Sequence, residues 1–262
     1  MKPVVTFATP SDGAVHLTHA TQAALLQDVE TALQNRKGFA LATLNLDHVV
    51  KLRRDPAFRT AYLAQTHVVA DGNPIVWLSR LAGRDVGLVP GSEAIVPLTA
   101  LAARLDVPIA FLGSTPDTLD AARTALQTQF PGLKVVAAIA PPYGFDPEGD
   151  AAAEALSEIA ASGAGLCFLA LGAPKQEVLA ARGLSLAPHC GFVSIGAGLD
   201  FISGQQKRAP VWVQRLAMEW LWRMLLNPAR LAGRYMACIA ILPSLTLTAL
   251  RDRKEAQSGE QP

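Results

Sequence analysis

Polar residues follow several apolar segments of this chain, and their types could support acid–base chemistry. Asp71 ends the apolar run 67–71 and stands directly before Gly72. A carboxylate at a strand end is well placed to act as a general base, but the Asp-Gly-Asn-Pro sequence also suits an Asx turn or a helix cap. Thr43 and Asn45 end an earlier run and could donate hydrogen bonds into the same cleft.

The segment Gly113-Ser114-Thr115-Pro116 joins a predicted strand to a predicted helix. Free backbone N–H groups and the helix dipole at such a junction favour an anion such as a phosphate. The simpler alternative is a tight turn in which Ser114 or Thr115 caps the helix.

A third candidate is "GAPKQE", where a strand-ending glycine, Gly172, precedes a helix-starting proline. Gln176 offers both a donor and an acceptor, which suits the edge of a base or a sugar. The alternative is a solvated first turn in which the helix dipole favours Glu177.

No metal or cofactor site is expected. His48, His67 and His189 lack metal-ligand spacing. There is no DxD-like pair to hold a nucleotide-bound metal, so arginines or backbone amides would have to meet phosphate charge. Neither GxGxxG nor GxxxxGK[ST] occurs, which argues against a dinucleotide-dependent oxidoreductase and a P-loop protein. Three cysteines lie far apart in apolar surroundings and are expected in the core: Cys167, Cys190 and Cys238.

The elements that would position these residues alternate along the chain. Six apolar runs are predicted strands: 38–45, 67–71, 107–113, 133–140, 165–172 and 191–198. Ala/Leu-rich segments of helical period lie between them: 46–66, 92–106, 116–130, 149–162 and 174–187. This order predicts an α/β fold with a doubly wound, mostly parallel, Rossmann-like sheet. Ligands bind outside the carboxyl ends of such strands, where the polar residues above are placed.

The net charge of +1 hides an uneven distribution. Residues 1–204 hold 14 Lys/Arg against 18 Asp/Glu, whereas residues 205–254 hold nine against two. We therefore divide the chain into an α/β domain over 1–204, a basic helical appendage over 205–254 and a disordered polar tail over 255–262. The acidic main body argues against a nucleic-acid partner.

The appendage combines arginines with tryptophans between residues 208 and 235. If this stretch were one helix, five arginines would share an arc of roughly 100°: Arg208, Arg215, Arg223, Arg230 and Arg234. One interpretation is an aromatic-flanked surface that meets anionic headgroups and pyrophosphate. The other is a solvated basic face whose tryptophans belong to the core.

The location follows from what the ends of the chain contain. The N-terminus has no secretion signal, so we expect a cytoplasmic protein. The apolar segment 236–250 has 15 residues and a central Pro243. It falls short of the roughly 20 residues that span a bilayer.

Taken together, six stretches carry a resemblance to a known family. They are "TLNLDHV" (43–49), "VVADGNPIVW" (68–77), "FLGS" (111–114), "LGAPKQE" (171–177), "GAGLDFISGQQKRAPVW" (196–212) and "MEWLWRMLLNPARLAGRY" (218–235). Their order and spacing resemble the WecG/TagA/CpsF family of bacterial glycosyltransferases. Many members carry an arginine shortly before Gly91, where this chain has Leu88-Val89-Pro90, so Arg84 is a candidate replacement.

The resemblance implies an inverting, metal-independent transfer of a hexose from a UDP-sugar to a sugar on undecaprenyl diphosphate. The reaction would serve exopolysaccharide or cell-wall polymer synthesis on the inner face of the cell membrane, without a cofactor. Asp71 would deprotonate the acceptor hydroxyl, and Thr43 would orient a sugar beside it. The donor could be UDP-glucose or UDP-N-acetylmannosamine, and the likeness of "DGNPIVW" to exopolysaccharide members favours glucose.

The C-terminal appendage resembles the family's membrane-docking element, and we expect it to act as a lid. Nine residues are expected to bind substrate: Asn45, Gly113, Ser114, Gly172, Gln176, Arg208, Arg223, Arg230 and Arg234. Gly113, Gly172 and Gln176 would hold the UDP, and the last three arginines would neutralise the diphosphates. The expected partners are the UDP-sugar, the lipid-linked acceptor and an anionic membrane surface. Whether the chain forms a homo-oligomer is left open. The alternative function is a non-catalytic nucleotide-sugar-binding module that recruits polysaccharide assembly enzymes to the membrane.

Overall fold

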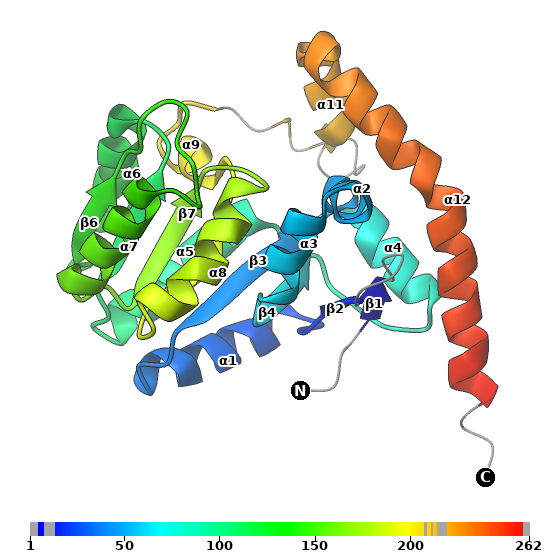
Figure 1. Ribbon diagram of the computed structural model, residues 1–262, viewed down its shortest axis with the longest axis horizontal. Helices are drawn as coiled ribbons and strands as arrows, with labels where there is room; N and C mark the ends of the chain where they lie inside the picture. The colour runs from blue at the N-terminus through cyan, green and yellow to red at the C-terminus, as the bar shows by residue number, and fades with distance from the viewer. Residues whose placement is uncertain (1–4, 8–13, 207–208, 211, 214–218, 259–262) are drawn as a thin grey trace.

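A six-stranded parallel sheet forms the centre of the protein (Figure 1). The computed structural model describes residues 5–7, 14–206, 209–210, 212–213 and 219–258. The strand order is β4-β3-β8-β7-β5-β6. The strands are β3 (Phe39–Leu44), β4 (His67–Ala70), β5 (Ile109–Gly113), β6 (Val135–Ile139), β7 (Leu166–Ala170) and β8 (Gly191–Ser194). Each lies within one of the six apolar runs, so the predicted strands are confirmed.

Helices cover both faces of the sheet. One apolar core contains residues of α1 (Gln22–Gln34), α5 (Gly91–Arg104), α6 (Pro116–Gln129) and α9 (Gly198–Ile202). Another contains residues of α7 (Asp150–Ser162) and α8 (Lys175–Leu186). Phe111 and Leu112, adjacent in β5, belong to these two different cores because successive strand residues point to opposite faces. The doubly wound α/β prediction is therefore confirmed, and Cys167 and Cys190 are buried as expected.

A third core lies beside β3 and β4. It contains residues of α2 (Leu46–Arg54), α3 (Pro56–Leu63) and α4 (Asn73–Leu81). The segment 46–66 forms two helices because the Asp55 side chain caps α3 and Pro56 occupies its first turn. Val15 and Leu17 of an N-terminal antiparallel hairpin, β1 (Val5–Phe7) and β2 (Val15–Leu17), also join this core.

The appendage contains α11 (Glu219–Leu226) and α12 (Pro228–Ser258), the second of which lies along α2 and α4 (Figure 1). The arginine-rich stretch is therefore not one helix, because Pro228 begins a new one. The side chains of Trp212 and Trp220 are 62% and 43% exposed, so these two tryptophans are not core residues. The predicted disordered tail begins too early, since α12 continues to Ser258; residues 259–262 lie outside the described part.

The apolar segment 236–250 lies within α12, which continues through Pro243. A proline removes a hydrogen-bond donor but need not end a helix whose remaining turns are supported. Residues 231–254 are consequently long and apolar enough, by length and composition, to cross a membrane. The expectation that this segment is too short to cross a membrane is wrong, because the helix extends beyond both ends of the segment.

Candidate functional site

Four loops that follow parallel strands turn at a glycine with positive φ. These glycines are Gly72 after β4, Gly113 at the end of β5, Gly172 after β7 and Gly196 after β8. Glycine adopts this conformation without steric cost, so each strand can turn sharply at its end. Carboxyl ends of parallel strands share one edge, and the four turns with the residues beside them form what we call the rim.

The turn after β5 is tightly built. A Cβ at Gly113 would lie 2.7 Å from the carbonyl oxygen of Ala170, so only glycine fits there. Ser114 also has positive φ, and its Oγ donates to Asp200 Oδ1 at 3.0 Å. Thr115, not Ser114, caps α6. The Ser114 side chain therefore joins the rim to α9.

Thr43 and Asp71 meet at the ends of the neighbouring strands β3 and β4. Thr43 Oγ1 donates to Asp71 Oδ2 at 3.3 Å. Thr43 is buried, and a Cβ at Gly91 would lie 3.2 Å from its Oγ1, so α5 packs directly against the threonine. The N-cap of α4 is Gly72 and carries no side-chain cap. The half-buried carboxylate of Asp71 thus lies at the rim and accepts a hydrogen bond from Thr43.

Asn45 begins α2. Its Oδ1 accepts from the backbone N–H of His48 at 3.0 Å, which is a standard N-cap. The His48 ring is buried and contacts the hydroxyl of Tyr62 at 3.2 Å. Burial lowers the pKa of His48 to about 3. Burial also raises the pKa of Tyr62, and the negative charges of Glu177 and Asp71 raise it further. These two residues beneath the rim are therefore neutral.

Gln176 and Glu177 are buried rather than solvated, so the solvated-turn alternative is wrong. Gln176 Oε1 accepts from the backbone N–H of Gly196, and its Nε2 donates to Glu177 Oε1, both at 2.9 Å. The side chain therefore ties the start of α8 to the turn after β8. Burial raises the pKa of Glu177 to about 7, against the opposing effects of the Gln176 hydrogen bond and the positive charge of Lys51.

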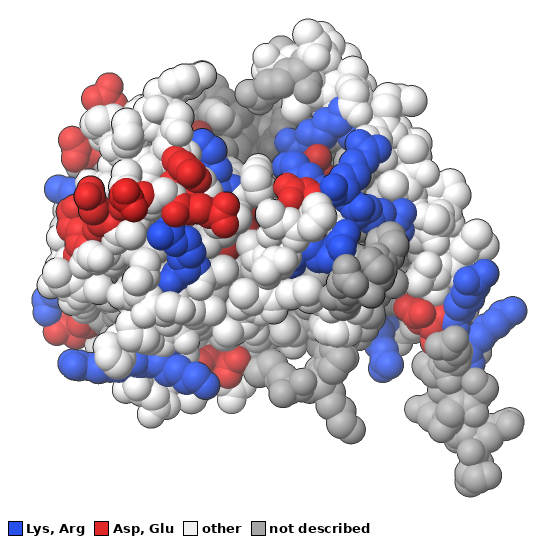
Figure 2. All heavy atoms as spheres, in the orientation of Figure 1, with Lys and Arg blue, Asp and Glu red and all other residues white. Residues whose placement is uncertain are grey.

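Cations of α2, which were not among the predicted site residues, also lie near the rim. Lys51 Nζ lies 2.9 Å from Asp47 Oδ2 and donates to the carbonyl oxygen of Ala173 at 3.4 Å. The i,i+4 spacing of Asp47 and Lys51 in the sequence could have predicted this ion pair. Figure 2 shows Lys and Arg side chains gathered where α2 and α12 meet, while acidic side chains gather toward the opposite end of this face. The basic surface therefore includes the last turn of α2, not the appendage alone.

The structure places the predicted arginines unevenly. Arg234 Nε lies 3.1 Å from Asp47 Oδ1, so this arginine joins α12 to α2. Arg208 lies outside the described residues, as do the side chains of Arg223 and Arg230. Arg84 follows the end of α4 opposite Gly72, about 13 Å of helix away, and it stays a candidate replacement for the missing arginine before Gly91.

The fold defines an α/β protein with a doubly wound parallel sheet, a class whose members bind ligands at the carboxyl edge of the strands. Comparison with known families narrows this class. The family model described as "Glycosyl transferase WecG/TagA/CpsF family" matches residues 13–258. The chain belongs to this family and is a glycosyltransferase, as the resemblance of its motifs predicted.

Two curated relatives are N-acetylglucosaminyldiphosphoundecaprenol N-acetyl-beta-D-mannosaminyltransferases. The protein from Bacillus spizizenii strain W23 is 28% identical over 201 residues, which cover 76% of each chain. The protein from Bacillus subtilis strain 168 is 25% identical over 227 residues, 86% of this chain and 84% of its own.

Proposed function

We propose that this protein transfers a hexose from a UDP-sugar to a sugar on undecaprenyl diphosphate with inversion at the anomeric carbon. The observation that carries the proposal is the Thr43–Asp71 pair on the rim. A carboxylate held in one orientation beside a polar cleft can accept a proton from an incoming hydroxyl. The relatives named above act on an undecaprenyl-diphosphate-linked sugar, which supports this acceptor class.

In the proposed reaction the acceptor hydroxyl oxygen attacks the anomeric carbon of the donor. A new glycosidic bond forms as the bond to the UDP oxygen breaks, and the hydroxyl proton passes to Asp71. UDP leaves with the bonding electron pair. The Thr43 hydroxyl would keep Asp71 Oδ2 oriented toward the acceptor, and the Tyr62 hydroxyl, whose pKa is raised by burial and by the charges of Glu177 and Asp71, stays neutral.

The charge that develops on UDP needs nearby donors. The turns at Gly113, Ser114 and Gly172 place backbone amides on the rim, and Lys51 and Arg234 supply cations at its border. These groups would meet the diphosphate without a metal ion. Asn45 and Gln176 would contribute indirectly, because they hold α2 and the turn after β8 in place. Arg208, Arg223 and Arg230 are given no role in binding the diphosphate.

The membrane-docking role of the appendage is also a proposal. Along α12, exposed apolar residues recur every three or four positions: Met236, Ile239, Pro243, Leu247 and Leu250. Buried residues of the same helix, Cys238, Leu245 and Ala249, pack toward the body. A helix with its inner face packed and an apolar outer face is suited to lie on a bilayer surface. We infer a peripheral protein on the inner face of the cell membrane that serves exopolysaccharide or cell-wall polymer assembly.

A donor screen tests the proposal. The full chain is incubated with UDP-glucose or UDP-N-acetylmannosamine and a short-chain lipid diphosphate bearing one sugar, and UDP release and the glycosylated lipid are both measured. We expect one donor to give both products, with a β-linked sugar from an α-linked donor, and equal rates with and without EDTA. Failure of both donors with several acceptor sugars would overturn the proposed substrates, and retention of configuration would overturn the mechanism.

A further inference from the structure

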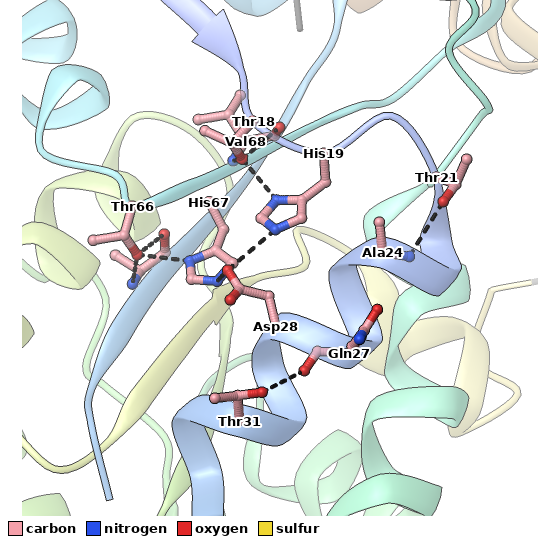
Figure 3. Close-up of polar contacts among 11 residues, drawn as sticks. Thr18, His19, Thr21, Ala24, Gln27, Asp28, Thr31, Thr66, His67 and Val68 are labelled. Carbon is pink, nitrogen blue, oxygen red and sulfur yellow. Dashed lines mark hydrogen bonds and ion pairs between the residues drawn. The ribbon is translucent and has the colours of Figure 1, made fainter. Parts of the chain in front are cut away.

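Two histidines and an aspartate meet at the other end of β4 from Asp71 (Figure 3). Asp28 Oδ2 lies 3.2 Å from His19 Nε2 and 3.1 Å from His67 Nε2. The three residues come from separate elements, since His19 follows β2, Asp28 lies on α1 and His67 begins β4. Both rings are buried, while the Asp28 side chain is 38% exposed. The group is therefore a buried pair of ligand nitrogens with a carboxylate at the solvent boundary.

The two histidines are held in the same way. Each follows a threonine whose Oγ1 lies 2.7–2.8 Å from the ring Nδ1, Thr18 for His19 and Thr66 for His67. Both threonine oxygens also accept a backbone N–H and lie 3.2 Å from a carbonyl oxygen. Each hydroxyl can therefore donate to the carbonyl while accepting from the ring Nδ1–H, which leaves the Nε2 lone pair free. Hydrogen bonds at the second nitrogen orient metal-binding histidines in this way.

The contacts around Asp28 do not satisfy both rings. His67 Nε2 is buried and, although 3.1 Å from Asp28 Oδ2, makes no hydrogen bond. The two rings are stacked, with centroids 5.0 Å apart, so a cation between the three atoms would contact both nitrogens and the carboxylate once the rings rotate toward it. Ligand atoms about 2.0–2.1 Å from a tetrahedral ion lie about 3.3 Å apart, close to the two nitrogen–oxygen distances of 3.1 and 3.2 Å, and all three ligand atoms lie within 4.8 Å of one another. Burial also lowers the pKa of both rings, that of His67 to about 4, so that they are neutral at physiological pH.

We propose that His19, Asp28 and His67 form a binding site for a divalent transition-metal ion of the zinc class. Two imidazoles and one carboxylate suit this class better than magnesium or calcium, which prefer oxygen ligands. The exposed side of Asp28 leaves room for water as a further ligand. The ion would tie the N-terminal hairpin and α1 to the first residue of β4.

The role of this site is structural. Asp71 follows the last residue of β4, whereas His67 is the first, so about 13 Å of extended chain separates them. An ion held by His67 is too far from Asp71 to contact the reacting atoms. The proposed site is therefore compatible with sugar transfer that needs no metal on the rim.

Metal binding to the intact, untagged chain tests the proposal. The protein is dialysed against EDTA, the chelator is removed, and Zn²⁺ is titrated by calorimetry while Co²⁺ is followed by its visible absorption. We expect one equivalent of each ion to bind and Zn²⁺ to raise the Tm. Asp28→Asn and His67→Gln should weaken Zn²⁺ binding by more than the roughly 10- to 100-fold typical of an outer-shell change. His189→Gln, which alters an exposed histidine outside the group, should bind like the wild type.

The variants are checked by far-UV circular dichroism. X-ray absorption of the Zn²⁺-loaded wild type gives a second measurement that needs no variant, and it should show two imidazoles with oxygen ligands. Failure of the folded wild type to bind Zn²⁺ or Co²⁺ would overturn the proposal. Undiminished binding by both variants, or a zinc spectrum without two imidazoles, would overturn it equally. None of these readouts depends on glycosyl transfer.

Discussion

Arg234 of α12 and Asp47 of α2 form an ion pair in which Nε and Oδ1 lie 3.1 Å apart. Asp47 also contacts Lys51, whose Nζ donates to the carbonyl oxygen of Ala173 beside the turn after β7. A continuous series of polar contacts thus runs from the appendage to the rim. Displacement of α12 would remove a cation from Asp47 and alter the position of Lys51.

Arg234→Gln tests this connection. The pair is partly exposed, with 46% of the Arg234 side chain accessible, so the free energy of unfolding should fall by no more than about 1 kcal/mol. The KM for the lipid-linked acceptor should rise several-fold because a cation at the border of the rim is lost. Steady-state kinetics with the acceptor varied measures the effect. Arg251→Gln, toward the other end of α12, is the control; equal effects of the two variants would contradict a specific role for Arg234.

Asp71→Asn should reduce kcat by about 10²- to 10⁴-fold, because an amide cannot take the acceptor proton. The affinity for UDP should stay unchanged, as calorimetry can establish. Thr43→Val should reduce kcat by roughly 10-fold, because one orienting hydrogen bond is lost. Thr43→Ser keeps that hydroxyl and should recover most of the rate. A kcat of Asp71→Asn within a few-fold of the wild type would rule out Asp71 as the base.

Most of the fold could be predicted from local sequence patterns. The six apolar runs became the six strands because each run is long enough for one buried strand and is bounded by turn residues. The rim followed from topology, since parallel strands must end at one edge and Thr43 and Asp71 both end strands. Side-chain geometry was not needed for either inference.

Other features depend on contacts that local patterns do not contain. His19 and His67 are far apart in sequence, and only the pairing of the hairpin with β4 brings them together. The sequence left open a solvated first turn at Glu177, yet α8 buries this residue against the sheet. The segment 236–250 looked too short to span a bilayer because its length was taken from the apolar residues alone, whereas packing on α2 and α4 supports a helix from Pro228 to Ser258.

Glu177→Gln should change the pH dependence of stability. The pKa of Glu177 is about 7 in the folded protein, against 4.5 for an ordinary glutamate. Between these values the folded state binds more protons than the unfolded state, so the free energy of unfolding falls as the pH rises. The glutamine variant lacks this loss and should be the more stable form at pH 8, by up to about 3 kcal/mol. Urea unfolding from pH 4.5 to pH 8 measures both curves, and parallel curves would contradict the prediction.

Gly113→Ala should destabilise the fold more than Gly132→Ala. Both glycines have positive φ, which costs an alanine about 1–2 kcal/mol. Only at Gly113 would the new Cβ also lie 2.7 Å from the carbonyl oxygen of Ala170; at Gly132 it would meet open space. The difference between the two free energies of unfolding therefore isolates the close approach of β5 and β7. Equal losses in the two variants would show that the turn relaxes to admit a Cβ.

Charges on the outer face of α12 should release the protein from membranes. Ile239 and Leu247 are 50% and 60% exposed, so replacement of both by glutamate leaves the packed face intact. Burial of each side chain in the bilayer surface is worth about 1.5–3 kcal/mol, and glutamates would also be repelled by anionic lipids. Binding to phosphatidylglycerol-containing vesicles should therefore fall by at least about 10-fold.

The matched control places the same two charges elsewhere. Leu63 and Leu186 are also exposed but lie at the ends of α3 and α8, away from the appendage. The double variant Leu63→Glu and Leu186→Glu should sediment with vesicles like the wild type. If both double variants lose binding equally, the loss reflects net charge rather than the face of α12. If neither loses it, the apolar stripe does not contact the bilayer and the proposed docking of the appendage is wrong.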